Sequence, residues 1–277
     1  MNEHTNDEMR AAVRDCYAAL ANGSIETASP ACCCRPAAEA SLQLGYSRED
    51  LALVPAGANL GLGCGNPQAI AALRPGETVL DLGSGAGFDC FLAAKQVGAT
   101  GKVIGVDMTG PMLSKARENA ARLAASNVEF RLGEIEHLPV PDASVDVILS
   151  NCVINLSPDK GAVFRDAFRV LRPGGRLAIS DVVAIAPLPE PPTRGAMTFT
   201  GCMTGAVSLQ TMQGMLRAAG FENIRIEVRE ESRAFIREWM PGSGAENYIA
   251  SATIQALKPG AKTSCSGPSC CAPELSA

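Results

Sequence analysis

Apolar strand segments alternate with amphipathic helix segments along residues 77–183 of this chain, and this alternation constrains the fold more than any other feature. The segments with the apolar character of buried strands are 77–83, 102–108, 127–133, 144–151 and 176–183. The helical segments between them are 87–97, 111–125 and 159–171. Buried strands joined through helices by short connections are typical of a doubly wound parallel sheet. We therefore expect an α/β fold with a mostly parallel sheet.

The rest of the chain differs in pattern, and we divide the 277 residues into four parts. They are an N-terminal helical segment with a cysteine-rich loop (1–60), the alternating core (61–186), a region with the last strands (187–258) and a flexible cysteine-containing tail (259–277). Outside the core, the spacing of apolar residues predicts helices at 8–20, 37–44, 47–53, 208–220 and 232–240, and strands at 222–230 and 248–258.

Charge and hydropathy exclude several classes of partner. Lys and Arg number 24 and Asp and Glu number 29, which gives a formal net charge of −5. An acidic chain without a basic face is not expected to bind nucleic acid or an anionic membrane. The first residues are too polar for a secretory signal, and the apolar runs fall short of the roughly 18 residues that a membrane-spanning helix requires. We expect a cytoplasmic protein with no nucleic-acid or membrane partner.

A glycine-rich turn, V-L-D-L-G-S-G-A-G-F, follows the first core strand. It contains Asp81, Gly83, Ser84, Gly85 and Gly87. Where a strand turns into a helix, such glycines let a ligand approach the backbone closely. A Walker phosphate loop needs G-x-x-x-x-G-K-[ST], which this turn lacks. The carboxylate of Asp81 opposes the pyrophosphate of NAD but suits the ammonium of S-adenosylmethionine, so the turn favours S-adenosylmethionine, with NAD as the weaker alternative.

Further candidate residues occur at the ends of the next core strands. Asp107 ends the second strand, where an acid can accept hydrogen bonds from both hydroxyls of a ribose. Met108 could pack against an adenine ring. After the third strand, the segment G-E-I-E places the side chain of Glu134 and the backbone of Ile135 near the edge of an adenine. Asn151 ends the fourth strand and completes the predicted site for S-adenosylmethionine.

The chain holds 11 cysteines but only 2 histidines, His4 and His137. Without a secretory signal we expect reduced thiols, and the shortage of histidine disfavours most zinc-hydrolase sites. Cys64, Cys152 and Cys202 stand among glycine, asparagine or polar turn residues, in loops that only the fold could bring together. Three thiolates without histidine suit a thiophilic ion that prefers three sulfurs in a pyramid.

Together, several motifs resemble the bacterial arsenite S-adenosylmethionine methyltransferases over roughly residues 10–258. The motifs are L-G-C-G-N-P at Cys64, D-L-G-S-G-A-G-F-D-C at Asp81, G-V-D-M-T at Asp107, G-E-I-E at 133–136, S-N-C-V-I-N-L-S-P-D-K at Cys152, V-L-R-P-G-G-R, S-D-V at Asp181 and G-C-M-T-G-A at Cys202. The resemblance implies a Rossmann-like class I methyltransferase fold with a mostly parallel sheet, plus a small α+β substrate-binding region. It also implies S-adenosyl-L-methionine as the cofactor.

The resemblance further implies roles for the matching cysteines. Cys152 and Cys202 would bind arsenic throughout methylation, and Cys64 would be the third ligand of inorganic arsenite. The family has another cysteine in its N-terminal region that is proposed to form disulfides during turnover, and its candidates here are Cys32, Cys33 and Cys34. Many members also carry tail cysteines thought to gather the metalloid, and the candidates here are Cys265, Cys270 and Cys271.

The expected function is that of an arsenite methyltransferase, which moves methyl groups from S-adenosylmethionine to thiolate-bound As(III) and yields methylated arsenicals in arsenic detoxification. The expected partners are arsenite, methylarsenite and, as reductant, thioredoxin or glutathione. Two alternatives stay open: a C- or O-methyltransferase of an organic metabolite, and a non-catalytic metalloid-binding protein. Cys16 and Cys90, on amphipathic helices, are interpreted as buried structural residues, and His137 as a surface residue.

Overall fold

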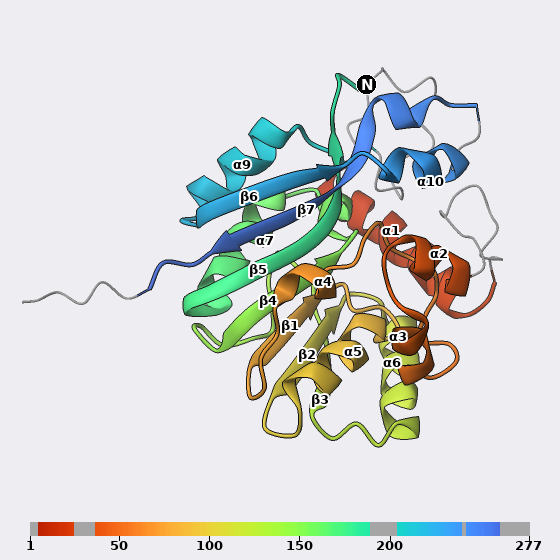
Figure 1. Ribbon diagram of the computed structural model, residues 1–277, viewed down its shortest axis with the longest axis vertical. Coiled ribbons are helices and arrows are strands. Elements are labelled where there is room, and N and C mark those ends of the chain that lie inside the picture. The colour runs from red at the N-terminus through yellow and green to blue at the C-terminus, as the bar shows by residue number, and fades with distance from the viewer. Residues whose placement is uncertain (1–4, 25–36, 189–203, 240–241, 261–277) are drawn as a thin grey trace, which may run out of the picture.

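The computed structural model describes residues 5–24, 37–188, 204–239 and 242–260. In these residues seven strands form one sheet in the order β3-β2-β1-β4-β5-β7-β6 (Figure 1). Their bounds are β1 Thr78–Leu82, β2 Lys102–Asp107, β3 Val128–Leu132, β4 Val145–Asn151, β5 Leu171–Ala184, β6 Glu222–Arg229 and β7 Ile249–Leu257. Neighbours among β1 to β5 are parallel, whereas β7 is antiparallel to both β5 and β6. The expected mostly parallel sheet is confirmed.

Helices lie on both faces of the sheet (Figure 1). The α-helices are α1 Asn6–Ala21, α2 Ala37–Gln43, α3 Arg48–Leu53, α4 Gln68–Ala71, α5 Phe88–Val97, α6 Gly110–Arg122, α7 Lys160–Val170, α9 Leu209–Ala218 and α10 Ser232–Trp239. Two short 3-10 helices are η1 Ile154–Leu156 and η2 Ala245–Asn247. Among the helices in the described ranges, none has both the length and the apolar character needed to cross a membrane.

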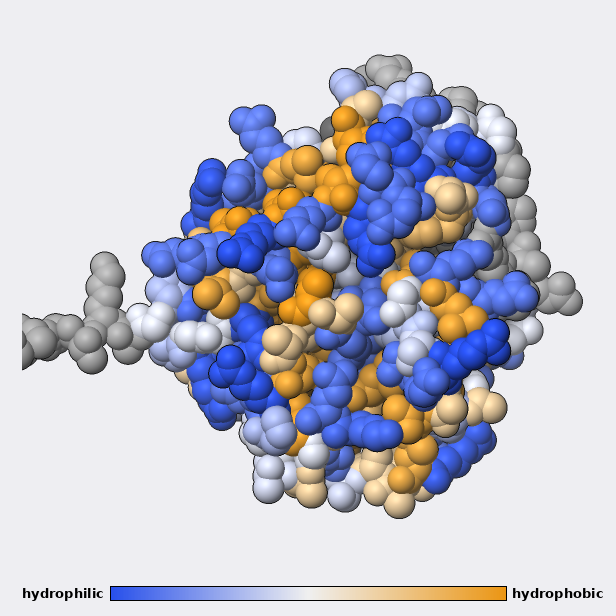
Figure 2. Space-filling view, in the orientation of Figure 1, coloured by the Kyte–Doolittle hydropathy of each residue, from blue (hydrophilic) through white to orange (hydrophobic). Residues whose placement is uncertain are grey.

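The alternation of side chains along β1 explains why both faces need a cover. Leu80 and Leu82 belong to one apolar cluster, together with Met212 of α9. Val79 belongs to another, together with Phe91 of α5. Because successive side chains of a strand point to opposite faces, an apolar run of this kind requires a helical layer on each side. Hydrophilic side chains predominate on the outer face that Figure 2 shows.

The strands β6 and β7 come from the part of the chain that the sequence analysis separates from the core (187–258), and they extend the same sheet. β7 pairs with β5 along its whole length, from Leu257 opposite Arg176 to Ile249 opposite Ala184. β6 then pairs with the other edge of β7. The local pattern predicts each strand, but the neighbour of a strand depends on residues far away in the sequence.

β5 begins earlier than the predicted strand 176–183. The R-P-G-G segment, which directly follows the predicted helix 159–171, lies within β5 as an irregular stretch. Leu171 pairs with Val145, and the register shifts before Arg176 pairs with Val147. Gly174 has a φ of +83°, a left-handed conformation that glycine adopts without strain. Such a bulge lets a strand continue through a sequence that reads locally as a turn.

Candidate active site

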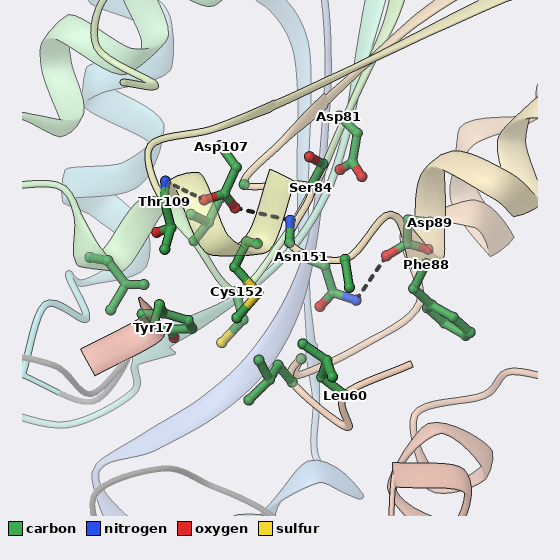
Figure 3. A pocket seen from close by; sticks show the side chains of 18 of the residues that line it. Tyr17, Leu60, Asp81, Ser84, Phe88, Asp89, Asp107, Thr109, Asn151 and Cys152 are labelled. Atoms are coloured by element: carbon green, nitrogen blue, oxygen red, sulfur yellow. Dashed lines mark hydrogen bonds between the residues drawn. The ribbon is translucent and has the colours of Figure 1, made fainter. Parts of the chain in front are cut away.

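A cavity lies beyond the carboxyl ends of β1, β2 and β4 (Figure 3). Parallel strands end at the same edge of a sheet, so the turns that follow them converge there. Ser84 follows β1, Asp107 ends β2 and Asn151 ends β4, and all three line the cavity. Tyr17 of α1 and Leu60 of the loop before β1 also line it. The N-terminal segment and the strand ends therefore both contribute to the walls of the cavity.

The glycine-rich turn has a backbone that favours glycine at three positions. The φ angle is +66° at Gly83, +51° at Gly85 and +94° at Gly87, within the left-handed region. Asp107 holds this turn, because its Oδ2 accepts the N–H of Gly85 at 2.9 Å and its Oδ1 accepts the N–H of Thr109 at 2.8 Å (Figure 3). Burial raises the pKa of Asp107, and the two N–H groups oppose this effect.

Asp81 brings a buried carboxylate to the cavity. The residue is 3% exposed, and the thiol of Cys90 donates to its Oδ2 at 3.2 Å. Burial, followed by the nearby charge of Asp89, raises the pKa of Asp81 well above its ordinary value. Cys90 is fully buried, in agreement with its interpretation as a structural residue. A cation bound in the cavity would stabilise the ionised form of Asp81.

Of the three residues predicted near the adenine, two line the cavity and one does not. Met108 and Ile135 line the cavity. Glu134 does not belong to the lining, and one of its carboxylate oxygens lies 3.5 Å from Nε of Arg10. Glu136, which the sequence analysis did not select, lines the cavity and is 5% exposed. In the segment G-E-I-E the second glutamate, rather than the first, therefore faces the site.

Two observations indicate that S-adenosylmethionine fits this cavity. The Oγ atom of Ser84 is buried in the lining, and the described part of the chain gives it no hydrogen-bond partner. A Cβ atom added at Gly85 would meet open space, so a ligand can approach the turn. Gly87 lies behind the lining instead, where a Cβ would overlap Phe91. With the two carboxylates described above, the turn offers acceptors that suit a cationic cofactor.

A buried hydrogen-bond network that the sequence analysis did not identify borders the cavity. Tyr46 Oη donates to Asp89 Oδ1 at 2.8 Å, and Asn151 Nδ2 donates to Tyr46 Oη at 3.1 Å and to the carbonyl of Gly65 at 2.9 Å. The N–H of Cys64 donates to Asn151 Oδ1 at 3.1 Å. Asn151 thus joins the loop that carries Cys64 to the end of β4. No motif marks Tyr46, because its partners are distant in the chain.

Cys64 and Cys152, which the sequence analysis expected to meet, lie together at this edge. Cys64 is 1% exposed and Cys152 is 8% exposed. Their sulfurs and a carboxylate oxygen of Asp181 lie within 4.8 Å of one another. Cys152 has a φ of +57°, which is uncommon for a residue with a side chain, and its N–H donates to the carbonyl of Ser180 at 2.8 Å.

Asp181 lies within β5, next to the end of β4, and was not selected as a site residue from the sequence. Its Oδ2 accepts the N–H of Ile154 at 3.0 Å, and its Oδ1 accepts the N–H of Val182 at 2.8 Å. Burial raises the pKa of Asp181 to about 6. The carboxylate therefore holds the turn after Cys152 against the end of β5. The S-D-V motif marks Asp181 in the sequence, but only the pairing of β4 with β5 brings its carboxylate beside the turn after Cys152.

The other predicted cysteines lie outside the described residues: Cys32, Cys33, Cys34, Cys202, Cys265, Cys270 and Cys271. Gly205, three residues after Cys202, is described, and a Cβ there would overlap the carbonyl oxygen of Asn155. The chain at Gly205 therefore packs directly on η1. His137 is exposed, as expected for a surface residue, and Cys16 is half-buried.

The sequence and the fold resemble those of known methyltransferases. Residues 73–220 match a family model described as a methyltransferase domain. A curated arsenite methyltransferase from Halobacterium salinarum is 53% identical over 91% of this chain and 67% of its own length. Another, from Aquipseudomonas alcaligenes, is 39% identical over 79% of this chain and 63% of its own length. The chain thus spans about two thirds of these two relatives.

Solved structures give the same picture. An arsenic(III) S-adenosylmethionine methyltransferase from Chlamydomonas reinhardtii superposes with a TM-score of 0.58 and 34% identity, covering 81% of this chain and 73% of the other. A SAM-dependent methyltransferase from Aquifex aeolicus superposes with a TM-score of 0.52 at 23% identity, covering 81% of this chain and 99% of the other. The second match supports the fold alone.

Proposed function

This chain belongs to the arsenite methyltransferases and is an S-adenosylmethionine-dependent enzyme, and from this premise we propose that it methylates As(III) held by the sulfurs of Cys64, Cys152 and Cys202. The observation that carries the proposal is the meeting of Cys64 and Cys152, from separate loops, within 4.8 Å. Soft thiolate sulfur is the preferred ligand of thiophilic ions. Two buried sulfurs beside a cofactor cavity would supply two of the three ligands that the proposal gives to As(III).

The packing of Gly205 supports Cys202 as the third ligand. Gly205 rests against the carbonyl of Asn155 in η1, which follows Cys152. Gly205 is three positions after Cys202, and a chain of that length spans at most about 11 Å. This limit on the distance between Cys202 and Gly205 supports our proposal that Cys202 supplies the third sulfur.

The residues around the cavity divide the binding of the cofactor between them. S-adenosylmethionine, when bound, supplies a methyl group on a cationic sulfonium. In our proposal Asp81 accepts hydrogen bonds from its ammonium, Asp107 from the ribose hydroxyls, and Ser84 gives a further polar contact. Met108 and Ile135 flank the adenine. The left-handed turn brings the backbone close to the ligand, so these contacts fix the direction in which the methyl group points.

The sulfurs perform the other half of the chemistry. Arsenic bound by three sulfurs keeps a lone pair on the side away from them, and it carries no proton that a general base must remove. His137, the one histidine in the described ranges, is exposed. Our proposal gives it no role as a general base. Catalysis then rests on alignment of the arsenic lone pair with the methyl group, for which effective molarities reach about 10⁵ M or more.

A reductant completes the cycle. Methyl transfer to As(III) removes two electrons from arsenic, so two thiols must become a disulfide before a further round. We assign this step to the cysteines at 32–34 together with thioredoxin or glutathione, thiol systems that keep cytoplasmic cysteines reduced. This assignment places the enzyme in the cytoplasm. The tail cysteines 265, 270 and 271 would collect arsenite for the site.

Serine variants of the two described sulfurs test the proposal. Cys152→Ser should abolish methylation of arsenite and of monomethylarsonous acid, because both need this ligand. Cys64→Ser should lose arsenite but keep monomethylarsonous acid, which has one fewer site for a sulfur. Cys16→Ser, a half-buried cysteine of α1, is the matched control and should keep both activities. The measurement is speciation of arsenic products formed with labelled S-adenosylmethionine.

Full arsenite methylation by Cys152→Ser would overturn the role of Cys152 as an arsenic ligand. Two outcomes in the wild-type protein would favour the alternatives. Absence of any methylated arsenical among the products would favour a methyltransferase of an organic metabolite. Arsenite binding by a wild-type protein that shows no heat of binding with S-adenosylmethionine in calorimetry would favour a metalloid-binding protein without catalysis.

A further inference from the structure

Cys64 and Cys152 border two different cavities. Cys152 lines the cofactor cavity of Figure 3. Cys64 lines a second cavity of about 290 Å³, which we term the Cys64 cavity. Its other walls come from the end of α2, the segment after β6, and α10, elements that lie at the same end of the sheet in Figure 1. They include Gln43, Leu44, Glu231, Ala234 and Phe235.

The loop that carries Cys64 separates the two cavities. The carbonyl of Cys64 accepts the Oγ–H of Ser251 at 2.6 Å, and the N–H of Cys64 donates to Asn151 Oδ1 at 3.1 Å. A Cβ added at Gly65 would overlap the side chain of Ser180. The loop is thus fixed on three sides, and the two sulfurs lie within 4.8 Å of each other across it. A substrate arriving from the Cys64 cavity would meet Cys64 first and Cys152 next.

The walls of the Cys64 cavity suit an uncharged ligand. Arg229 lies in the wall, but its guanidinium is paired with Glu231 at 2.8 Å. A second carboxylate, that of Glu238, lines the same cavity. Glu231 balances the charge of Arg229, so with Glu238 these three side chains carry one net negative charge, which opposes the entry of an oxyanion. Leu44 and Phe235 give apolar surface. Arsenite is the uncharged As(OH)₃ at neutral pH, whereas arsenate and phosphate are anions.

We propose that the Cys64 cavity is a separate entrance through which uncharged trivalent arsenic reaches the sulfur pair while the cofactor cavity is already filled. The inference rests on the proposed function. At Cys64 an As–S bond forms and an As–O bond breaks, and the thiol proton leaves with the hydroxyl as water. No electrons are transferred. Cys152 then takes the second bond in the same way, on the side of the cofactor.

Substitutions at the mouth of this cavity test the entrance. Ala234 and Gln43 are exposed and stand on different walls, so Ala234→Phe and Gln43→Phe should narrow the mouth without disturbing the core. Gln210→Phe, at an exposed position of α9 outside both cavities, is the matched control. The measurement is the rate at which arsenite forms As–S bonds, followed by near-ultraviolet absorbance, in protein saturated with S-adenosylhomocysteine.

We expect both mouth variants to take up arsenite about tenfold more slowly than wild type. Their affinity for S-adenosylhomocysteine and their equilibrium affinity for arsenite should stay unchanged, because a narrowed mouth slows entry and exit equally. Wild-type uptake should be as fast with S-adenosylhomocysteine bound as without it. The proposal of a separate entrance would be overturned if bound S-adenosylhomocysteine blocked the uptake of arsenite. It would also be overturned if both mouth variants took up arsenite at the rate of wild type. Absence of any As–S absorbance in wild type would instead overturn the proposed function.

Discussion

Single carboxylates set the electrostatics of the cofactor cavity. Asp81, Asp89 and Asp107 lie within one region of the lining, and burial is the largest cause that raises the pKa of each. Asp89 is in addition held by Tyr46, whose hydroxyl donates to it. Burying several acids costs stability. A cationic ligand bound among them offsets that cost, and this links cofactor binding to proton release.

The effect of pH on cofactor affinity follows from Asp81. Its pKa is raised in the free protein, and a bound ammonium must lower it, so binding releases a proton. The affinity for S-adenosylmethionine should therefore rise with pH until the pH exceeds the raised pKa of Asp81. Asp81→Asn should weaken binding about 10- to 100-fold, the loss expected for a hydrogen bond to a charged group, and should flatten this pH dependence.

Calorimetry in buffers of different ionisation enthalpy measures both the affinity and the protons released. Asp15→Asn, which removes an exposed carboxylate from α1, should change neither quantity. If Asp81→Asn keeps the pH dependence of the wild type, the ammonium contact is assigned to the wrong residue.

Residues whose chemistry follows from a local motif could be predicted from the sequence. Asp107 and Cys152 are examples, because Asp107 ends β2 and Cys152 directly follows β4, each within a recognisable segment, and both line the cavity. The place of Tyr46 in the site could not be predicted, and the S-D-V motif at Asp181 did not reveal the role of that carboxylate. Their importance comes from contacts with residues brought close only by strand order, as when Asp181 accepts the N–H of Ile154.

At the scale of elements, the turn from Cys152 through η1 is clamped by the end of β5. The side chain of Asn155 donates to the carbonyl of Val182 at 2.6 Å, and the N–H of Cys152 donates to Ser180. These contacts hold Cys152 at a positive φ. The segment at Gly205 closes on the same turn. The position of one sulfur thus depends on three separate stretches of chain.

A methyl group at Gly205 should disturb this arrangement. In Gly205→Ala the new Cβ would overlap the backbone of Asn155, so the segment must move away from the turn and carry Cys202 with it. We expect kcat/KM for arsenite to fall about tenfold or more, since small misplacements cost about that much in rate. The affinity for S-adenosylmethionine should be unchanged, because the cofactor contacts lie elsewhere.

A second glycine provides the control. A Cβ at Gly214 in α9 would meet no atom within 4 Å, and alanine favours a helix over glycine by about 1 kcal/mol. Gly214→Ala should therefore raise the free energy of unfolding and leave arsenite kinetics unchanged. Normal arsenite kinetics in Gly205→Ala, with the stability of both variants checked by urea unfolding, would contradict the role given to this contact.

The bounds of most elements could be predicted because apolar periodicity is a local property. The helix 87–97 corresponds to α5 and the strand 102–108 to β2. The early start of β5 and the place of β6 and β7 in the main sheet could not be predicted. A bulge such as that at Gly174 depends on the partner strand β4, and strand order depends on which edges are left for pairing.

At the scale of the whole molecule, one edge of the sheet concentrates ionisable groups in the interior. Asp81, Asp89 and Asp181 are buried and Asp107 is half-buried, and loss of solvent raises the pKa of each. Other acids have a pKa that is lowered, not raised, in the folded protein. The guanidinium of Arg131 lowers the pKa of Glu129 to about 2. The balance between the acids with a raised pKa and the acids with a lowered pKa decides how the stability of the cofactor-free protein varies with pH.

The sign of that variation can be worked out from Asp181. Its pKa is about 6 in the folded protein against 3.8 ordinarily, so between these values the folded state binds more protons than the unfolded state. The free energy of unfolding then decreases as pH rises through this range, by about 3 kcal/mol in total for this one group. The other three acids, whose pKa is also raised in the folded protein, shift stability in the same direction. Acids whose pKa is lowered in the folded protein, such as Glu129, lose their stabilising contribution only at lower pH.

We therefore expect the cofactor-free protein to be more stable at about pH 5 than at about pH 7.5, in contrast to the usual behaviour of paired surface carboxylates. Urea unfolding at the two values measures the difference. Asp181→Asn, which cannot ionise, should show a smaller difference than wild type. Saturating S-adenosylmethionine should also reduce it, because the ammonium stabilises the ionised form of Asp81. A protein whose stability rises from pH 5 to pH 7.5 would show that these carboxylates are ionised and compensated in the folded state without any ligand.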